Sequence, residues 1–258
     1  MKPLKLALLF SLLALAACGT SPRSGSDASS GDRSKASAEA IRNLGEAYLA
    51  GGNLTAALRE LKRAEGIDPD DHITQFDIGL VYLYRDRYDQ AIQHLQRAIT
   101  LKPDFAPAIN SLGNAYLAKG EWDKAIEAYQ RIIEDVFYGT PHFALSNMGL
   151  AYYQKKDYPE AEKQFQEALK LNPDFVNALA GLATTYMAMG RYDDAIAKLE
   201  RAVRKEPKLP HLHYELGKAH EGARNLPKAR EEYQRAVELA PDSPLGEDAQ
   251  KALRRLGQ

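Results

Sequence analysis

The sequence has one cysteine, one tryptophan and no excess of charge of either sign. A single cysteine excludes an intramolecular disulfide, so the core must hold the fold. The formal net charge of −1 gives no basic field to neutralise phosphates, so we expect no nucleic-acid partner. Long hydrophobic runs are also missing. The most apolar stretch, residues 6–17, is too short to cross a bilayer of about 30 Å at about 1.5 Å per helical residue.

Catalytic motifs are missing as well. The sequence contains no glycine-rich phosphate loop and no nucleophile elbow, and its one thiol lies near the N-terminus. His213 and His220 are seven residues apart and share a helix face. We interpret them as packing residues, and a metal pair supported by Glu221 is the alternative. The sequence therefore predicts no enzyme, no cofactor, no metal site and no small-molecule substrate.

The N-terminus has the layout of an export signal. Lys2 and Lys5 precede the apolar residues 6–13, and Ala16 and Ala17 precede Cys18. This arrangement resembles a bacterial lipobox, which implies a signal peptide over residues 1–17, cleavage before Cys18, and acylation of that cysteine by fatty acids such as palmitate. The alternative is an ordinary or uncleaved signal with a chance cysteine.

The next segment, residues 18–37, is rich in Ser, Gly and Asp and lacks apolar periodicity, so we predict a lipidated cysteine followed by a flexible tether. Gly19 after the cysteine resembles lipoproteins sorted to the outer membrane. The expected location is the outer membrane, lipid-anchored and facing the periplasm, with inner-membrane sorting left open.

From residue 38 the chain repeats itself. Small residues recur with spacings of 34, 34, 36, 34 and 34 residues, and an alanine follows each of them twelve positions later. The small residues are Gly45, Gly79, Gly113, Gly149, Ala183 and Gly217, and the alanines are Ala57, Ala91, Ala125, Ala161, Ala195 and Ala229. Small residues in this pattern predict two helices per unit that cross closely at the first position.

The 34-residue period, with a proline closing most units, resembles the tetratricopeptide repeat. The resemblance implies an all-α, right-handed superhelical solenoid of six repeats over residues 38–243. Its boundaries are 38–71, 72–105, 106–141, 142–175, 176–209 and 210–243. Residues 244–258 carry an amphipathic stripe that includes Ala249, Ala252 and Leu256, which predicts a C-terminal capping helix.

Turn and cap residues refine the helix ends. Gly52, Gly120 and Gly190 are expected to end first helices in a left-handed turn, which glycine adopts at little cost. Second helices are expected to begin with an N-cap at Thr55, Asp89, Asp123 and Asp193, or with Pro159 and Pro227 in the first turn.

In this fold the first helix of each repeat lines the concave surface. The groove positions of repeats two to four are largely apolar, and an exposed helix that is apolar on two faces usually binds something. The alternative is that superhelix curvature buries these side chains. The predicted partner-binding groove residues are Phe76, Leu80, Leu83, Tyr84, Asn110, Asn114, Leu117, Phe143, Leu150 and Tyr153.

One interval breaks the period. Between Ala125 and Ala161 two extra residues occur, and an Asp-x-x-Tyr-x-x-Pro sequence ending at Pro141 is followed by Asn147-Met148-Gly149-Leu150. This loop, with the lipobox, tether and six repeats, resembles the PilF/PilW family of outer-membrane pilotins. The resemblance implies a non-enzymatic scaffold that aids secretin assembly and localisation in type IV pilus biogenesis. The alternative is a generic periplasmic adaptor lipoprotein for envelope enzymes or other secretion machinery. The docking surface is either the groove or the loop at residues 137–141.

Overall fold

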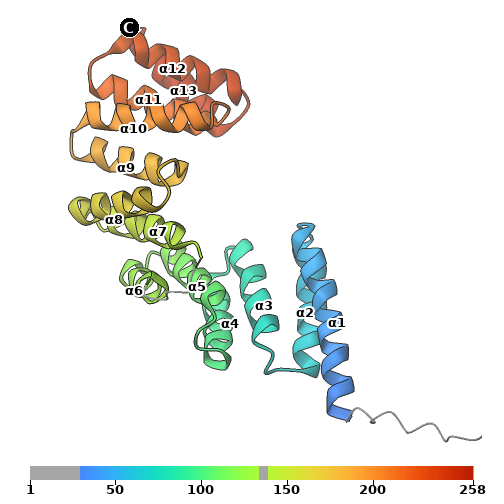
Figure 1. Ribbon diagram of the computed structural model, residues 1–258. Coiled ribbons are helices and arrows are strands. Elements are labelled where there is room, and N and C mark those ends of the chain that lie inside the picture. Colours follow the sequence, from blue (N-terminus) through green and yellow to red (C-terminus); the bar gives the residue numbers. More distant parts are fainter. Residues whose placement is uncertain (1–29, 134–138, 258) are drawn as a thin grey trace, which may run out of the picture.

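The computed structural model describes residues 30–133 and 139–257, and all the regular structure in them is helical. The helices stack in a curved array, with α1 at one end and α13 at the other (Figure 1). Their bounds are α1 (Ser30–Ala50), α2 (Leu54–Ile67), α3 (His72–Tyr84), α4 (Tyr88–Leu101), α5 (Ala106–Lys119), α6 (Trp122–Ile133), α7 (Pro141–Gln154), α8 (Tyr158–Leu171), α9 (Val176–Ala188), α10 (Tyr192–Lys205), α11 (Pro210–Gly222), α12 (Leu226–Leu239) and α13 (Pro244–Leu256). The predicted all-α solenoid is confirmed.

The array has an inner and an outer side. The most extensive contacts join the two helices of one repeat, such as α1 with α2 and α3 with α4. The backbone of each odd-numbered helix also lies close to that of the next odd-numbered helix, from α1 to α13. In the described chain the backbones of consecutive even-numbered helices stay further apart, and α2 and α4 meet through side chains such as Lys62 and His94. The odd-numbered helices therefore line the concave side and the even-numbered helices form the convex side.

The predicted helix crossings are confirmed. A Cβ atom built on Gly113 would lie 2.6 Å from Tyr129 Cε1, and one on Gly79 would lie 2.7 Å from Leu95 Cγ. The alanine twelve residues after each crossing position is fully buried. Because any larger side chain would push the paired helices apart, the small residues set the spacing inside each repeat.

The predicted left-handed turns are confirmed at Gly52, Gly120 and Gly190, with φ of 74°, 82° and 75°. The other three repeats use the same backbone conformation with non-glycine residues. Asp86, Lys156 and Arg224 have φ of 56°, 63° and 60°. The left-handed turn therefore occurs in every repeat, but only three of the six repeats have a glycine at that position.

The predicted N-caps are wrong by two residues. The second helices begin at Leu54, Tyr88, Trp122 and Tyr192, so the expected caps lie inside the first turn. Asn53 caps α2, its side chain accepting a hydrogen bond of 3.1 Å from the amide of Ala56. Asp89, Asp123 and Asp193 instead place negative charge in the first turn, where it complements the helix dipole. Pro159 and Pro227 do occupy first turns.

The N-terminal end of the solenoid differs from the prediction, and the C-terminal end agrees with it. Helix α1 begins at Ser30, so residues 30–37 are helical, whereas the sequence predicted a tether there. These residues extend a helix that is already nucleated, and adding a turn to an existing helix costs far less than starting one. At the other end α13 packs Ala249 and Ala252 against α12, which confirms the capping helix.

No helix among the described residues combines the length and the apolar character needed to cross a membrane.

Candidate partner-binding site

The concave face is uncharged across its middle. Its groove positions lie −6, −3, +1, +4 and +5 from the crossing residue of each repeat, and none of them is charged in repeats two to five. The residues are Ile73, Phe76, Leu80, Leu83 and Tyr84; Pro107, Asn110, Asn114, Leu117 and Ala118; Phe143, Ser146, Leu150, Tyr153 and Gln154; and Asn177, Ala180, Thr184, Met187 and Ala188. Charges occupy these positions only in the terminal repeats: Glu39, Arg42 and Glu46 in repeat one, and Lys218 and Glu221 in repeat six.

Three predicted groove residues are large, apolar and exposed. Tyr84 is 64% exposed, Phe143 44% and Leu150 38%. They come from α3 and α7, so they are spread along the groove. Apolar groups that remain open on an otherwise polar surface often mark a site of protein interaction.

Other predicted groove residues take part in packing. Phe76 meets Phe105 edge-to-face at a centroid distance of 5.3 Å, and Leu83 packs against the cluster between α4 and α5. Leu117 and Tyr153 pack against the central core cluster, and Leu80 is half-buried. Curvature therefore covers part of the groove, and Tyr84 is more open than Phe76.

The predicted asparagines have different environments. Asn114 Oδ1 accepts hydrogen bonds from the Tyr129 hydroxyl at 2.7 Å and from Asn147 Nδ2 at 3.0 Å. This links the inner helices of repeats three and four. Asn110 Oδ1 is buried and has no hydrogen-bond partner among the described residues.

An acidic pair occupies the corresponding junction between repeats one and two. Glu46 and Asp77 occupy the same repeat positions as Asn114 and Asn147, two repeats earlier in each case. Asp77 is 5% exposed, and its burial together with the neighbouring Glu46 carboxylate raises the pKa of Asp77 to about 8. Arg42 Nε bonds Glu46 at 3.1 Å and Arg42 Nη1 bonds Asp71 at 2.9 Å. At neutral pH Asp77 is therefore protonated, which makes an acid pair tolerable here.

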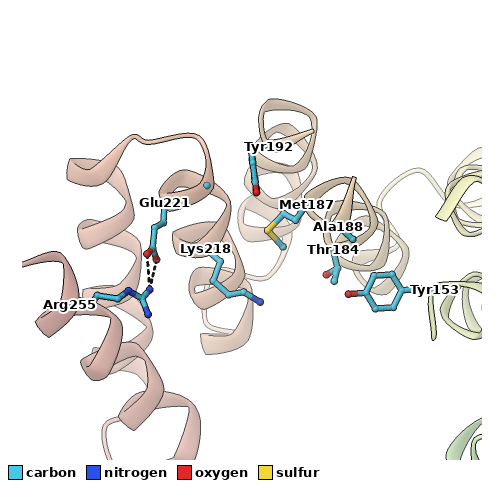
Figure 2. A pocket seen from close by; sticks show the side chains of 9 residues that line it. Tyr153, Thr184, Met187, Ala188, Tyr192, Lys218, Glu221 and Arg255 are labelled. Carbon is cyan, nitrogen blue, oxygen red and sulfur yellow. Dashed lines mark hydrogen bonds and ion pairs between the residues drawn. The ribbon is translucent and has the colours of Figure 1, made fainter. Parts of the chain in front are cut away.

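The concave side of repeats four to six contains a hollow of about 600 Å³, which we call the repeat-five notch. Figure 2 shows its lining: Tyr153, Thr184, Met187, Ala188, Tyr192, Lys218, Glu221, Gly222 and Arg255. Repeat five has small side chains at three groove positions, Ala180, Thr184 and Ala188. The larger side chains of the flanking repeats therefore stand above it as walls.

Hydrogen bonds fix one wall of the notch. Glu221 accepts bonds from Arg255 Nη2, at 2.7 Å to each carboxylate oxygen (Figure 2). It also accepts a bond from the Tyr233 hydroxyl at 2.7 Å. Burial and this bond to Glu221 raise the pKa of Tyr233, so its hydroxyl keeps its proton and remains a donor. The Tyr192 ring lies against the Gly222 backbone, where an added Cβ would be 2.2 Å from Tyr192 Cε1.

The histidines of repeat six serve packing contacts. His213 Nδ1 pairs with Glu232 at 2.7 Å, and its Nε2 lies 3.0 Å from the Pro207 carbonyl oxygen. His220 is 4% exposed, and burial lowers its pKa. Glu221, the ligand considered with them, is occupied by Arg255 and Tyr233.

Family profiles described as tetratricopeptide repeat match residues 30–72, 180–244, 152–207 and 104–174, and one described as TPR repeat matches residues 79–120. The chain is a tetratricopeptide-repeat protein. Like the family, it is a scaffold for protein–protein interaction.

Curated relatives match over short regions. The mouse DnaJ homolog subfamily C member 7 is 32% identical over 96 residues, which are 37% of this chain and 19% of that protein. Hsp70-Hsp90 organizing protein 3 of Arabidopsis thaliana is 27% identical over 93 residues, 36% of this chain and 17% of that protein. The chain thus matches only about a fifth of the length of these relatives.

Two solved structures match over almost their whole length. PilW, described as a widely conserved type IV pilus biogenesis factor, superposes with a TM-score of 0.76 at 21% identity and covers 82% of this chain and 97% of its own. PilF of Pseudomonas aeruginosa gives a TM-score of 0.70 at 18% identity, with 86% and 99% covered. At these identities the likeness is one of fold.

Two predicted sites lie outside the described residues. They are the lipidation site at Cys18 and the loop residues Phe137 and Tyr138. Of the predicted loop, only Gly139, Thr140 and Pro141 are described, and Pro141 begins α7.

Proposed function

We propose that this protein is a lipid-anchored pilotin, a scaffold that captures a secretin-type outer-membrane protein in its concave groove during type IV pilus biogenesis. The observation that carries the proposal is the uncharged concave face, with Tyr84, Phe143 and Leu150 exposed on it. The likeness to PilW and PilF over nearly their whole chains supports the same assignment.

The groove is tested by adding charge to it. Leu80→Glu/Tyr84→Glu places two carboxylates where the partner is expected to bind, and burying an unpaired carboxylate costs far more than the lost contact. We expect pull-down of the secretin from detergent extract to be abolished, while circular dichroism shows unchanged helicity because the packing residues Ile78, Gly79 and Tyr82 are untouched.

The matched control is Ile67→Glu/Leu171→Glu. These residues are 40% and 56% exposed at the ends of outer helices, so the control adds the same charge away from the groove. Capture should survive in this variant. If the folded groove variant captures the secretin normally, the groove assignment fails. If the unaltered protein captures no secretin, the pilotin assignment fails and the adaptor function becomes the better one.

The anchor is tested separately at Cys18. Acyl chains contribute about 0.8 kcal/mol per buried methylene, and stable anchoring takes more than one chain. Cys18→Ser should give an uncleaved precursor or a protein lost from the outer-membrane fraction. A mature Cys18→Ser protein that still fractionates with the outer membrane would show that the anchor lies elsewhere.

A further inference from the structure

The repeat-five notch ends the uncharged part of the concave face. Its floor consists of the small or flexible side chains Thr184, Met187 and Ala188, and its flanks carry Tyr153 and Lys218 (Figure 2). Met187 is half-buried and Ala188 is exposed, so the floor is open to the groove. A hollow of this kind accepts one protruding side chain from a bound segment.

The lining groups favour an aromatic ring. A methionine sulfur attracts aromatic rings, tyrosine rings pack edge-on or offset against them, and an ammonium group binds over a ring face. Met187, the pair Tyr153 and Tyr192, and Lys218 supply these three groups around one hollow. Lys218 already lies 5.7 Å from the centroid of the Tyr214 ring.

The charges of the notch do not oppose such a guest. The Glu221 carboxylate is held by Arg255 and Tyr233, and Lys218 Nζ is bonded to Glu215 at 2.9 Å. No unpaired carboxylate therefore lines the hollow. Interfaces gain most of their binding energy from a few anchors, often Trp or Tyr, that fill such pockets.

We propose that the repeat-five notch is an anchor pocket for one aromatic side chain of the segment bound in the concave groove. This inference rests on the proposed function, because it takes the concave face as the partner surface. It adds a second contact region, two to four repeats away from Leu80 and Tyr84, and it requires an aromatic residue in the partner.

The probe for the test is N-acetyl-tryptophan amide, with N-acetyl-leucine amide as the non-aromatic control. The whole chain, labelled with carbon-13 at its methionine methyl groups, reports binding by nuclear magnetic resonance. Met187 lines the notch, whereas Met189 is 38% exposed outside it and Met148 is buried in the core. We expect a saturable ring-current shift of the Met187 methyl only, with affinity on the order of tenfold higher for the tryptophan amide than for the leucine amide.

Two tryptophan substitutions at the same groove position locate the effect. Ala188→Trp fills the notch and should abolish the Met187 shift, and Ala118→Trp in repeat three should leave it intact. Tyr153→Leu, which keeps the wall apolar but removes the ring, should weaken binding several-fold. The inference is overturned if Met187 does not shift, if Met189 shifts equally, if the leucine amide binds equally, or if folded Ala188→Trp still binds.

Partner capture separates this inference from the proposed function. Ala188→Trp should reduce secretin pull-down, and Ala197→Trp, on the exposed side of the outer helix α10, should not. If Leu80→Glu/Tyr84→Glu abolishes capture while Ala188→Trp leaves it unchanged, the groove is the partner site but the notch is not an anchor pocket. If neither variant affects capture, the proposed function itself fails.

Discussion

The helix crossings and the outer surface of the solenoid differ in the residues that form them: small and apolar residues at the crossings, charged residues on the outside. At the helix crossings the contacts are buried and sterically tight, as where Gly113 meets Tyr129, and a small residue recurs at this position in each repeat. The outer surface is laced with ion pairs that differ from repeat to repeat, such as Lys155 with Asp123, whose side chains are 33% and 83% exposed. The tightly packed crossing positions therefore specify the fold, whereas the exposed ion pairs contribute little to its stability.

The strongest test of this contrast is Gly113→Leu. The new side chain would collide with Tyr129 at the crossing of α5 and α6, and overpacking costs typically about 1–3 kcal/mol or more. Thermal unfolding should shift to lower temperature and become less cooperative, because each repeat depends on its neighbours.

The control for that variant is Gly66→Ala in the outer helix α2. Nothing lies within 4 Å of a Cβ built on Gly66, so alanine should stabilise the protein by about 0.5–1 kcal/mol through its higher helix propensity. Equal melting temperatures for the two variants would show that the crossing is not tight.

A smaller effect is expected at the acidic pair between α1 and α3. Folded Asp77 keeps its proton up to about pH 8, whereas an unfolded aspartate loses it near pH 4. The folded state therefore binds the extra proton, and its stability declines as pH rises through the folded pKa. Between pH 7 and 9 the free energy of unfolding should fall by roughly 1 kcal/mol.

Asp77→Asn should remove that decline, since an amide cannot ionise and Asn147 fills the corresponding position in repeat four. Urea unfolding at pH 7, 8 and 9 measures it. The range from pH 7 to 9 also avoids the titration of His94 and His220. Burial lowers the pKa of both histidines, so their titration makes the free energy of unfolding rise with pH, and it does so below pH 7. A parallel decline in both proteins would assign the pH dependence to other groups.

The smallest effect is expected on the outer surface. Asp123→Asn removes the partner of Lys155, but exposed ion pairs contribute little because water and salt screen them. The unfolding midpoint should not change measurably. A loss of stability comparable to that of Gly113→Leu would overturn the distinction between tightly packed and exposed contacts.

Much of the fold could be predicted because it depends on residue size at fixed spacing. The crossing glycines, the buried alanines and the capping stripe of α13 are all visible in the sequence. The turns at Asp86, Lys156 and Arg224 were missed because their left-handed backbone is imposed by the repeat and not by the residue. The sequence placed the start of helix α1 too late because residues 30–37 gain helical order from the helix they extend, and residues 31–37 remain exposed.

Less of the site than of the fold could be predicted from the sequence. The apolar groove positions could be read from the period, but the packing of Phe76 on Phe105 depends on how closely successive repeats approach. The repeat-five notch needs three repeats to form. Its signal in the sequence was the run of small residues Ala180, Thr184 and Ala188 between bulkier neighbours, and that signal has meaning only once the curvature is known.

The contacts between inner helices also have a mechanical consequence. The backbones of successive odd-numbered helices lie close together, whereas those of the described even-numbered helices behind them stay further apart. The array therefore resists tighter curling, since the inner helices are already in contact, but it can straighten by parting them one junction at a time. Successive inner helices contact each other less extensively than the two helices of one repeat do. A force that pulls the two ends apart would therefore separate the inner helices and lengthen the molecule before any repeat unfolds.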